Sequence, residues 1–141
     1  MAEKEKLNAL KWLGRARGID REIDTLLAAK DEAREQLTKI TQSYQSDGAQ
    51  TTKDPHKFDR LVELESIIDE KVDELVNVKT EILAEINKIE SGKQRTVLVD
   101  YYVRCMTFEE IAVATGRSFR NVAYTKKRGV QAVEKNLRNI H

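Results

Sequence analysis

The stretch Thr107-Phe-Glu-Glu-Ile-Ala-Val-Ala-Thr-Gly-Arg-Ser-Phe-Arg-Asn-Val122 decides the fold of the C-terminal third of this chain. Thr107 and Glu110 have the spacing of a capping box, in which a hydroxyl and a carboxylate accept unpaired backbone amides at a helix start. Gly116 suits a sharp turn, because glycine adopts backbone conformations that other residues avoid. Ser118 is a favourable N-cap for a second helix. The stretch therefore predicts two capped helices joined by a short turn.

The residues Ala112, Gly116 and Val122 have the spacing of a helix-turn-helix motif. Ala112 is small enough for close helix approach, and Val122 supplies a branched apolar residue to the second helix. That helix is expected over about 119–137, with inward-facing Val122, Val130, Val133 and Leu137. A shorter helix over 96–106 precedes the motif, with candidate core residues Val97, Leu98, Tyr101, Tyr102 and Cys105.

The second helix of such a motif enters the major groove of duplex DNA, with its N-terminal residues on base edges. Residues 117–128 include five basic residues and no acidic one, which favours contact with phosphate. Arg120 and Asn121 can pair with guanine and adenine edges, and Tyr124 lies one turn after Arg120. The alternative is a solvated basic helix face. The predicted DNA-binding residues are Arg117, Ser118, Arg120, Asn121, Tyr124, Lys126, Lys127 and Arg128.

The charge of the chain is divided unevenly along its length. The 141 residues carry a net charge of +1. Residues 1–91 hold 15 Lys and Arg against 20 Asp and Glu, whereas residues 92–141 hold 10 against 4. This asymmetry is typical of a basic functional end joined to an acidic carrier.

Two longer segments, about 5–44 and about 55–91, carry apolar residues every three or four positions, which predicts two long helices. The segment 45–54 between them lacks this pattern and is expected to be a loop. Asp54 and Pro55 are typical of the N-cap and first position of the second helix. The two helices can bury their apolar rows against each other as an antiparallel, coiled-coil-like hairpin, and pairing between two chains would bury them equally well.

Glycines mark the expected breaks in these helices. Gly14 and Gly18 indicate a bend or a separate short first helix, and Ser91-Gly92 indicates a helix end and a hinge. The chain contains one proline, so long helices can run uninterrupted and little or no strand is expected. The predicted fold is all-α, with a long helical hairpin over 1–91 followed by a small helix-turn-helix domain over 92–141.

The run from Leu98 to Tyr124 resembles region four of bacterial sigma factors, the part that binds the −35 promoter element. The residues that carry the resemblance are Tyr101-Tyr102, Thr-Phe-Glu-Glu-Ile-Ala at 107–112, Gly116-x-Ser118, and Val122 followed by basic residues. The arrangement of a charged hairpin before this module is similar to small phage and prophage proteins of Gram-positive bacteria that are grouped with late-gene transcriptional activators.

This resemblance implies an intracellular, phage-derived transcription regulator that binds double-stranded DNA. Two departures qualify it. Residues 1–91 are taken up by the hairpin, so there is no segment like region two and the chain is not a complete sigma factor. Ala123 is small at a position on the recognition helix where a larger contact residue can stand, which leaves the base preference open.

Three functions fit these features. The first is a sequence-specific regulator that uses the hairpin to form a homodimer or to contact RNA polymerase. The second is the DNA-recognition component of phage packaging, similar to a small terminase subunit, which would form a ring. The third is a protein-binding adaptor for RNA polymerase that does not bind DNA.

An enzyme is not expected. His56 and His141 have no nucleophile or metal-ligand set at useful spacing, and no glycine-rich phosphate loop is present, so no catalytic residue, metal or cofactor is predicted. Cys105 is the only cysteine, which excludes an internal disulfide, and its apolar neighbours predict a buried thiol. The chain lacks an apolar run of about 20 residues and an N-terminal signal pattern, so a cytoplasmic protein without a membrane partner is expected.

Overall fold

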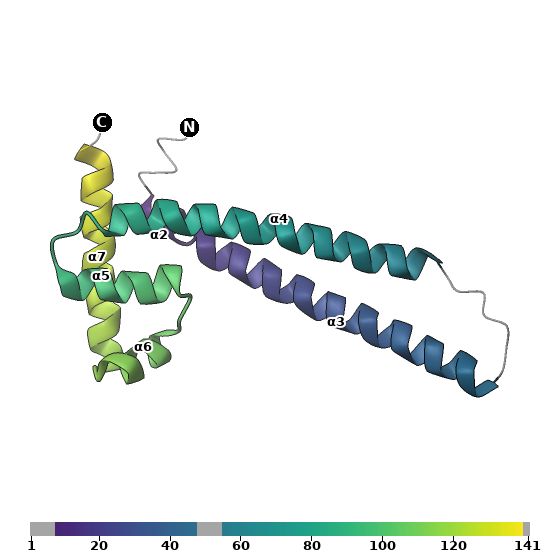
Figure 1. Cartoon of the computed structure of the whole chain (residues 1–141). Helices are drawn as coiled ribbons and strands as arrows, with labels where there is room; N and C mark the ends of the chain where they lie inside the picture. Colours follow the sequence, from purple (N-terminus) through teal and green to yellow (C-terminus); the bar gives the residue numbers. More distant parts are fainter. Residues whose placement is uncertain (1–7, 48–54, 140–141) are drawn as a thin grey trace. The chain divides into compact units, whose positions relative to one another are not determined.

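The structure is a computed structural model that describes residues 8–47 and 55–139, with side chains described for 8–39 and 58–139. Its helices are α2 (Ala9–Leu13), α3 (Arg15–Asp47), α4 (Pro55–Ile86), α5 (Gly92–Leu98), the π-helical turn η1 (Val99–Val103), α6 (Phe108–Thr115) and α7 (Phe119–Asn139) (Figure 1). The described residues include no strand, which confirms the all-α class. None of the described helices is long and apolar enough to cross a membrane.

The described residues group into two compact units. One contains 8–20 together with 75–139, and the other contains 21–47 together with 55–74. The boundary expected near Gly92 does not coincide with this grouping, because α2 and the last turns of α4 belong to the unit that contains α5, α6 and α7. Buried apolar residues of α2 explain part of the difference, since α2 packs against α7.

In the second unit, α3 and α4 run antiparallel. Lys71 Nζ lies 3.0 Å from Glu22 Oε2, and Lys30 Nζ lies 3.4 Å from Glu65 Oε1. The hydrogen bond and the charge of Glu22 raise the pKa of Lys71 above its ordinary value. α3 continues to Asp47, so part of the expected loop is helical, and 48–54 lies outside the described residues.

The second long helix ends earlier than its apolar pattern predicts. α4 stops at Ile86, where the amides of Lys88 and Ile89 donate to carbonyl oxygens three residues back and tighten the last turn. Arg95 Nη1 then donates to the carbonyl oxygens of Ile89, at 2.6 Å, and Glu90, at 2.9 Å. These bonds satisfy carbonyl groups that would otherwise lack partners after the helix end.

The expected stop and hinge at Ser91-Gly92 is a helix start instead. The Ser91 side chain accepts a hydrogen bond from the Gln94 amide at 3.3 Å, and Gly92 is the first residue of α5. Near the N-terminus, Gly14 separates α2 from α3, which matches the predicted short first helix. Residues 5–7, where that helix was expected to begin, lie outside the described residues.

The short helix expected over 96–106 has other bounds. α5 ends at Leu98, η1 follows to Val103, and the Arg104 amide donates to the Val99 carbonyl five residues back. Cys105 comes after the helical part, with a φ of 58°. Its side chain is half-buried rather than buried, because this backbone conformation takes it out of the helix.

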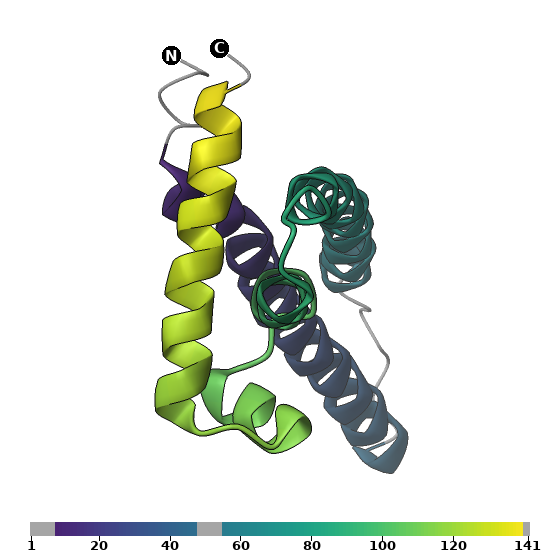
Figure 2. The same cartoon turned by 90° about the vertical axis from the view of Figure 1, so that its left-hand side faces the viewer.

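The core around α7 depends on one close approach. α5 crosses α7, and α6 lies at the N-terminal end of α7 (Figures 1 and 2). A Cβ atom at Gly129 would lie 3.0 Å from the Leu98 side chain, so the absence of a side chain lets α5 approach α7. The predicted inward-facing residues of α7 are all buried, namely Val122, Val130, Val133 and Leu137.

Candidate nucleic-acid interface

The capping box predicted at the start of α6 is present. The Thr107 amide donates to Glu110 Oε1 at 3.0 Å, and the Glu110 amide donates to Thr107 Oγ1 at 3.1 Å. The hydrogen bonds from Thr107 lower the pKa of the Glu110 carboxyl below its ordinary value, because they stabilise the charged form. Two polar side chains therefore fix the first turn of α6.

The turn between α6 and α7 occupies residues 116–118. Gly116 has a φ of 67°, and its amide and that of Arg117 donate to the carbonyl oxygen of Ala112. Ser118 Oγ accepts a hydrogen bond from the Asn121 amide at 3.1 Å, as expected for an N-cap. Ile111 and Val122 form a buried cluster with Val97 across this turn. Local polar contacts and a small apolar core thus set the angle between α6 and α7.

One face of α7 gathers four of the predicted residues and continues beyond them. The exposed side chains recur every three or four positions, and Tyr124 is 61% exposed. Lys135 and Arg138 were not among the predicted residues, although their spacing after Arg128 places them on the same face. We call this set the basic face of α7; it consists of Arg120, Tyr124, Lys127, Arg128, Gln131, Lys135 and Arg138.

Two predicted residues lie at the edge of this face. Arg117 and Asn121 are half-buried. Arg117 Nη1 and Asn121 Oδ1 are each shielded from solvent without a hydrogen-bond partner among the described residues. Ser118 is exposed, but its hydroxyl is engaged as the N-cap. Arg117, Ser118 and Asn121 therefore belong to the first turn of α7 and the residues before it, and they contribute little to the exposed face of the helix.

Lys126 is separate from the basic face. Its Nζ atom lies 4.8 Å from the centre of the Tyr101 ring and 5.3 Å from that of Tyr102. Burial lowers the pKa of the Lys126 ammonium below its ordinary value, and the positive charge of Arg17 lowers it further. Lys126 was predicted as a phosphate contact, but its side chain packs on the aromatic residues of its own domain.

Aromatic residues, beginning with Tyr101, also connect the start of α3 to α6 and α7. Arg17 Nη1 donates to the carbonyl oxygens of Tyr101, at 2.9 Å, and Met106, at 3.0 Å. The Tyr101 ring stacks on Phe108 with 5.1 Å between centroids, and Phe108 contacts Phe119 edge to face. Arg17 has no sequence signal for this role, because its contacts are 84 and 89 residues away in the chain.

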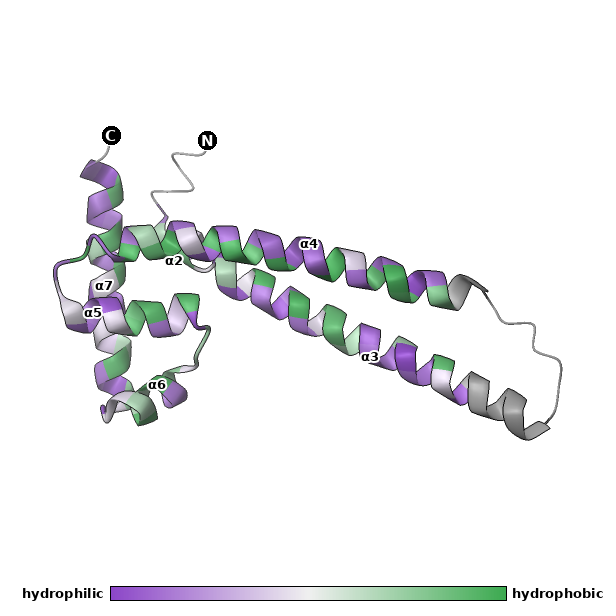
Figure 3. Cartoon of the chain, viewed as in Figure 1, coloured by the Kyte–Doolittle hydropathy of each residue, from purple (hydrophilic) through white to green (hydrophobic). Residues whose placement is uncertain are grey.

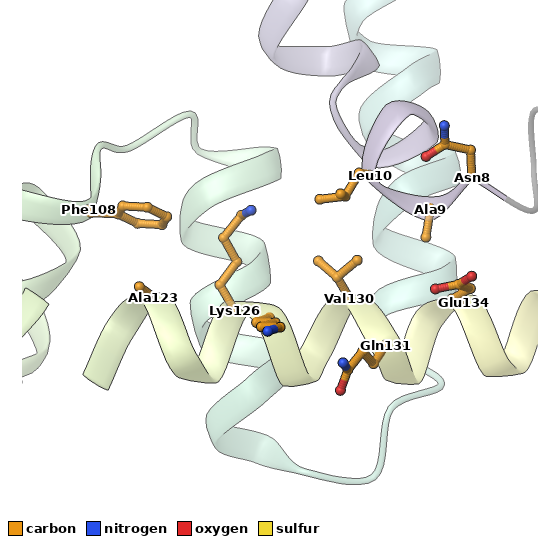
Figure 4. A pocket seen from close by; sticks show the side chains of 10 residues that line it. Asn8, Ala9, Leu10, Phe108, Ala123, Lys126, Val130, Gln131 and Glu134 are labelled. Atoms are coloured by element: carbon orange, nitrogen blue, oxygen red, sulfur yellow. The ribbon is translucent and has the colours of Figure 1, made fainter. Parts of the chain in front are cut away.

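A groove of about 400 Å³ borders the basic face, between α2, the start of α6 and α7. Figure 4 shows Lys126 reaching into the space between Phe108 and Leu10, with Val130 on the α7 side. Leu10 is 58% exposed, and Val130 is buried. The lining residues are Asn8, Ala9, Leu10, Phe108, Ala123, Lys126, Lys127, Val130, Gln131 and Glu134.

Comparison with known proteins identifies a family for most of the chain. No curated protein and no solved structure matches the chain. A family model described as "Protein of unknown function (DUF1492)" matches residues 38–137, well over half of the chain. The matched region includes α4, the capping box, the turn 116–118 and the basic face up to Lys135. The chain therefore belongs to the family described as "Protein of unknown function (DUF1492)".

Proposed function

We propose that this protein is a transcription regulator that binds duplex DNA through α6 and α7 acting as a helix-turn-helix. The observation that carries the proposal is the basic face of α7, which is exposed on a helix that follows a short turn and an N-cap. The second helix of such a motif is the one that enters the major groove. The basic face is therefore the surface that meets DNA.

The charges on this face favour phosphate along its whole length. Arg120, Lys127, Arg128, Lys135 and Arg138 are basic, and the face as defined includes no acidic residue. Glu134 lies beside the face and is paired with Arg138, whose Nη2 atom is 2.7 Å away. The first turn of α7 contains no acidic residue, so the positive end of the helix dipole is not neutralised there.

The length of α7 divides the face into two functional parts. Arg120 and Arg138 are separated by about 27 Å at a rise of about 1.5 Å per residue, and in helix-turn-helix proteins the N-terminal residues of the second helix contact base edges. The C-terminal end of α7 is therefore assigned to the DNA backbone. Arg120 and Tyr124, near the N-terminus of α7, are assigned to base edges. Lys127, Arg128, Lys135 and Arg138 are assigned to phosphates on either side.

The regulatory role is supported by the sequence resemblance to sigma factor region four over 98–124. On this proposal the protein is of phage or prophage origin and recognises a specific site. A selection of bound DNA from a random duplex pool, performed with the full chain at two salt concentrations, tests the site specificity. An enriched motif is expected at both concentrations. Recovery of unenriched sequences at both would contradict the proposal.

A second candidate function, a protein-binding adaptor for RNA polymerase, is favoured by the groove beside α7. Leu10, which is 58% exposed, lines this groove together with Phe108 and Ala123, and duplex DNA offers few apolar groups to cover it. Binding of purified RNA polymerase to the full chain without DNA tests this function. Loss of that binding in Leu10→Asp would support the adaptor role, and absence of binding in the unmodified chain would exclude it.

A further inference from the structure

Helix α4 carries a second apolar row besides its buried one. Its buried residues include Ile68, Leu75, Ile82 and Ile86. Six large apolar residues of α4 are between 36% and 62% exposed, and five of them, all except Ile67, share one side of the helix, namely Phe58, Val62, Val72, Val76 and Leu83. Apolar segments recur between polar ones along α4 in Figure 3. Scattered exposed apolar residues are ordinary, but a regular row requires a specific explanation.

The five residues fall on a heptad pattern. Counted from Phe58, heptad positions alternate steps of four and three residues along one uninterrupted helix, and the intervening positions hold Glu65, Asp69 and Lys79, of which Glu65 and Lys79 are half-buried. Such spacing is typical of the seam of a coiled coil, where each side chain fits between four residues of a partner helix. We call these positions the heptad row; they are Phe58, Val62, Glu65, Asp69, Val72, Val76, Lys79 and Leu83.

Two charged residues of the heptad row have no ion-pair partner among the residues whose side chains the structure describes. Asp69 and Lys79 make no salt bridge among the described residues, whereas Glu65 lies 3.4 Å from the Lys30 ammonium. Asp69 and Lys79 flank Val72 and Val76 symmetrically in sequence. A partner that covers the two valines must therefore also meet one negative and one positive charge.

A second copy of the same helix in antiparallel orientation meets this requirement. In the register that places Val72 opposite Val76 of the second copy, Asp69 lies opposite Lys79 of the second copy. The two-fold symmetry of a homodimer repeats both pairs. A parallel copy would instead place Asp69 opposite Asp69 and Lys79 opposite Lys79, and like charges at facing positions disfavour pairing. Charge complementarity thus selects both the partner and its direction.

We propose that two copies of this chain associate through the central part of the heptad row of α4, from Asp69 to Lys79, as an antiparallel coiled coil. The four central valines of the dimer form its apolar layers, and the two pairs between Asp69 and Lys79 set its register. The pairing does not depend on DNA binding, so either proposal can fail without the other.

The mass of the full chain in solution tests this proposal. Light scattering after size exclusion is expected to give twice the chain mass of 16.2 kDa. Val76→Glu should lower the mass to that of a monomer, because it places a charge in the apolar centre. Asn77→Glu adds the same charge at an exposed position next to the row and should leave the dimer intact. Far-ultraviolet circular dichroism should show equal helicity in both variants.

A charge exchange tests the direction of pairing. Asp69→Lys and Lys79→Asp should each shift the equilibrium toward monomer by at least tenfold in dissociation constant, and the double variant should recover dimerisation because opposite charges again face each other. A monomer at all concentrations would overturn the proposal. Single variants that remain as dimeric as the unmodified chain would also overturn it. A ring larger than a dimer would overturn it as well and would favour a role in phage packaging.

Discussion

The guanidinium of Arg17 lies 4.1 Å from the centre of the Tyr101 ring, and its Nη1 atom donates to the Tyr101 carbonyl oxygen at 2.9 Å. A second bond from the same atom reaches the Met106 carbonyl oxygen at 3.0 Å. One side chain near the start of α3 thus holds both ends of the segment that leads into α6. Because Tyr101 also stacks on Phe108, this contact helps to place the first residue of α6.

Arg17→Ala should destabilise the unit that contains α7 by about 2 kcal/mol, since it removes hydrogen bonds from a charged donor and a cation–π contact. Unfolding in urea, followed by the fluorescence of Trp12, measures this loss in the same unit. Arg21→Ala is the matched control, because Arg21 is exposed and should cost at most about 0.5 kcal/mol. Equal losses in the two variants would show that the Arg17 contacts do not stabilise the fold.

The contrast between Arg17 and the capping box shows which features of the fold can be predicted from the sequence. Thr107 and Glu110 are three residues apart, so their pairing depends only on the local helix start, and the prediction is confirmed. The Arg17 contacts join residues 84 and 89 positions apart and have no local pattern. The two compact units likewise depend on contacts between distant segments, such as the packing of α2 against α7. They therefore do not follow the charge difference between residues 1–91 and 92–141.

In the candidate interface, too, local sequence patterns predict some side-chain positions and miss those that depend on the tertiary structure. Helical spacing identifies Arg120, Tyr124, Lys127 and Arg128 as neighbours on one face, and it could also have identified Lys135. The same spacing places Lys126 on the inner side of α7, four residues from both Val122 and Val130, although Lys126 is predicted from the sequence as a DNA contact. The aromatic residues that receive the Lys126 ammonium come from η1 and α6, so only the tertiary structure reveals them.

Alanine is expected to have opposite effects on stability at two helical glycines. α5 approaches α7 closely at Gly129, whereas the space around Gly18 is open. Gly129→Ala places a Cβ atom 3.0 Å from the fully buried Leu98 side chain, and the overpacking, about 1–3 kcal/mol, is expected to outweigh the gain in helix propensity. Gly18→Ala meets nothing within 4 Å and should stabilise α3 by about 0.5–1 kcal/mol, because alanine is the better helix former. Thermal unfolding of both variants checks the signs. Stabilisation by Gly129→Ala would contradict the packing described for Leu98.

The turn before α7 should tolerate asparagine better than alanine. Gly116 has a φ of 67°, and alanine in this left-handed region costs roughly 1–2 kcal/mol. Asparagine adopts this conformation more readily, so Gly116→Asn should lose less stability than Gly116→Ala. Urea unfolding of the two variants gives the order. The reverse order would argue against a left-handed residue at this turn.

The capping box should make the stability of α6 depend on pH in the acidic range. The pKa of Glu110 is lowered in the folded state, so its contribution is present above the ordinary value of 4.5 and is lost as the pH falls through the lowered pKa. Hydrogen exchange of the α6 amides, measured between about pH 3 and 6, should show faster opening at low pH after correction for intrinsic exchange.

Glu110→Gln is the control for this pH dependence. Glutamine retains an oxygen acceptor for the Thr107 amide but does not titrate. The variant should show the same opening of α6 across the range, apart from contributions of other carboxylates. An unchanged pH dependence in Glu110→Gln would assign the effect to a different group.

The salt dependence of DNA binding in two adjacent lysine variants tests the central claim most directly. Lys127 belongs to the basic face of α7, whereas Lys126 packs on Tyr101 and Tyr102. Methionine at either position removes the charge and keeps a similar volume.

The measurement is the slope of log Kobs against log salt concentration for a selected DNA site. We expect Lys127→Met to reduce the magnitude of the slope by about 1 and Lys126→Met to leave it unchanged. Binding without salt dependence, or equal loss of slope in both variants, would contradict the assignment of the basic face of α7 to DNA.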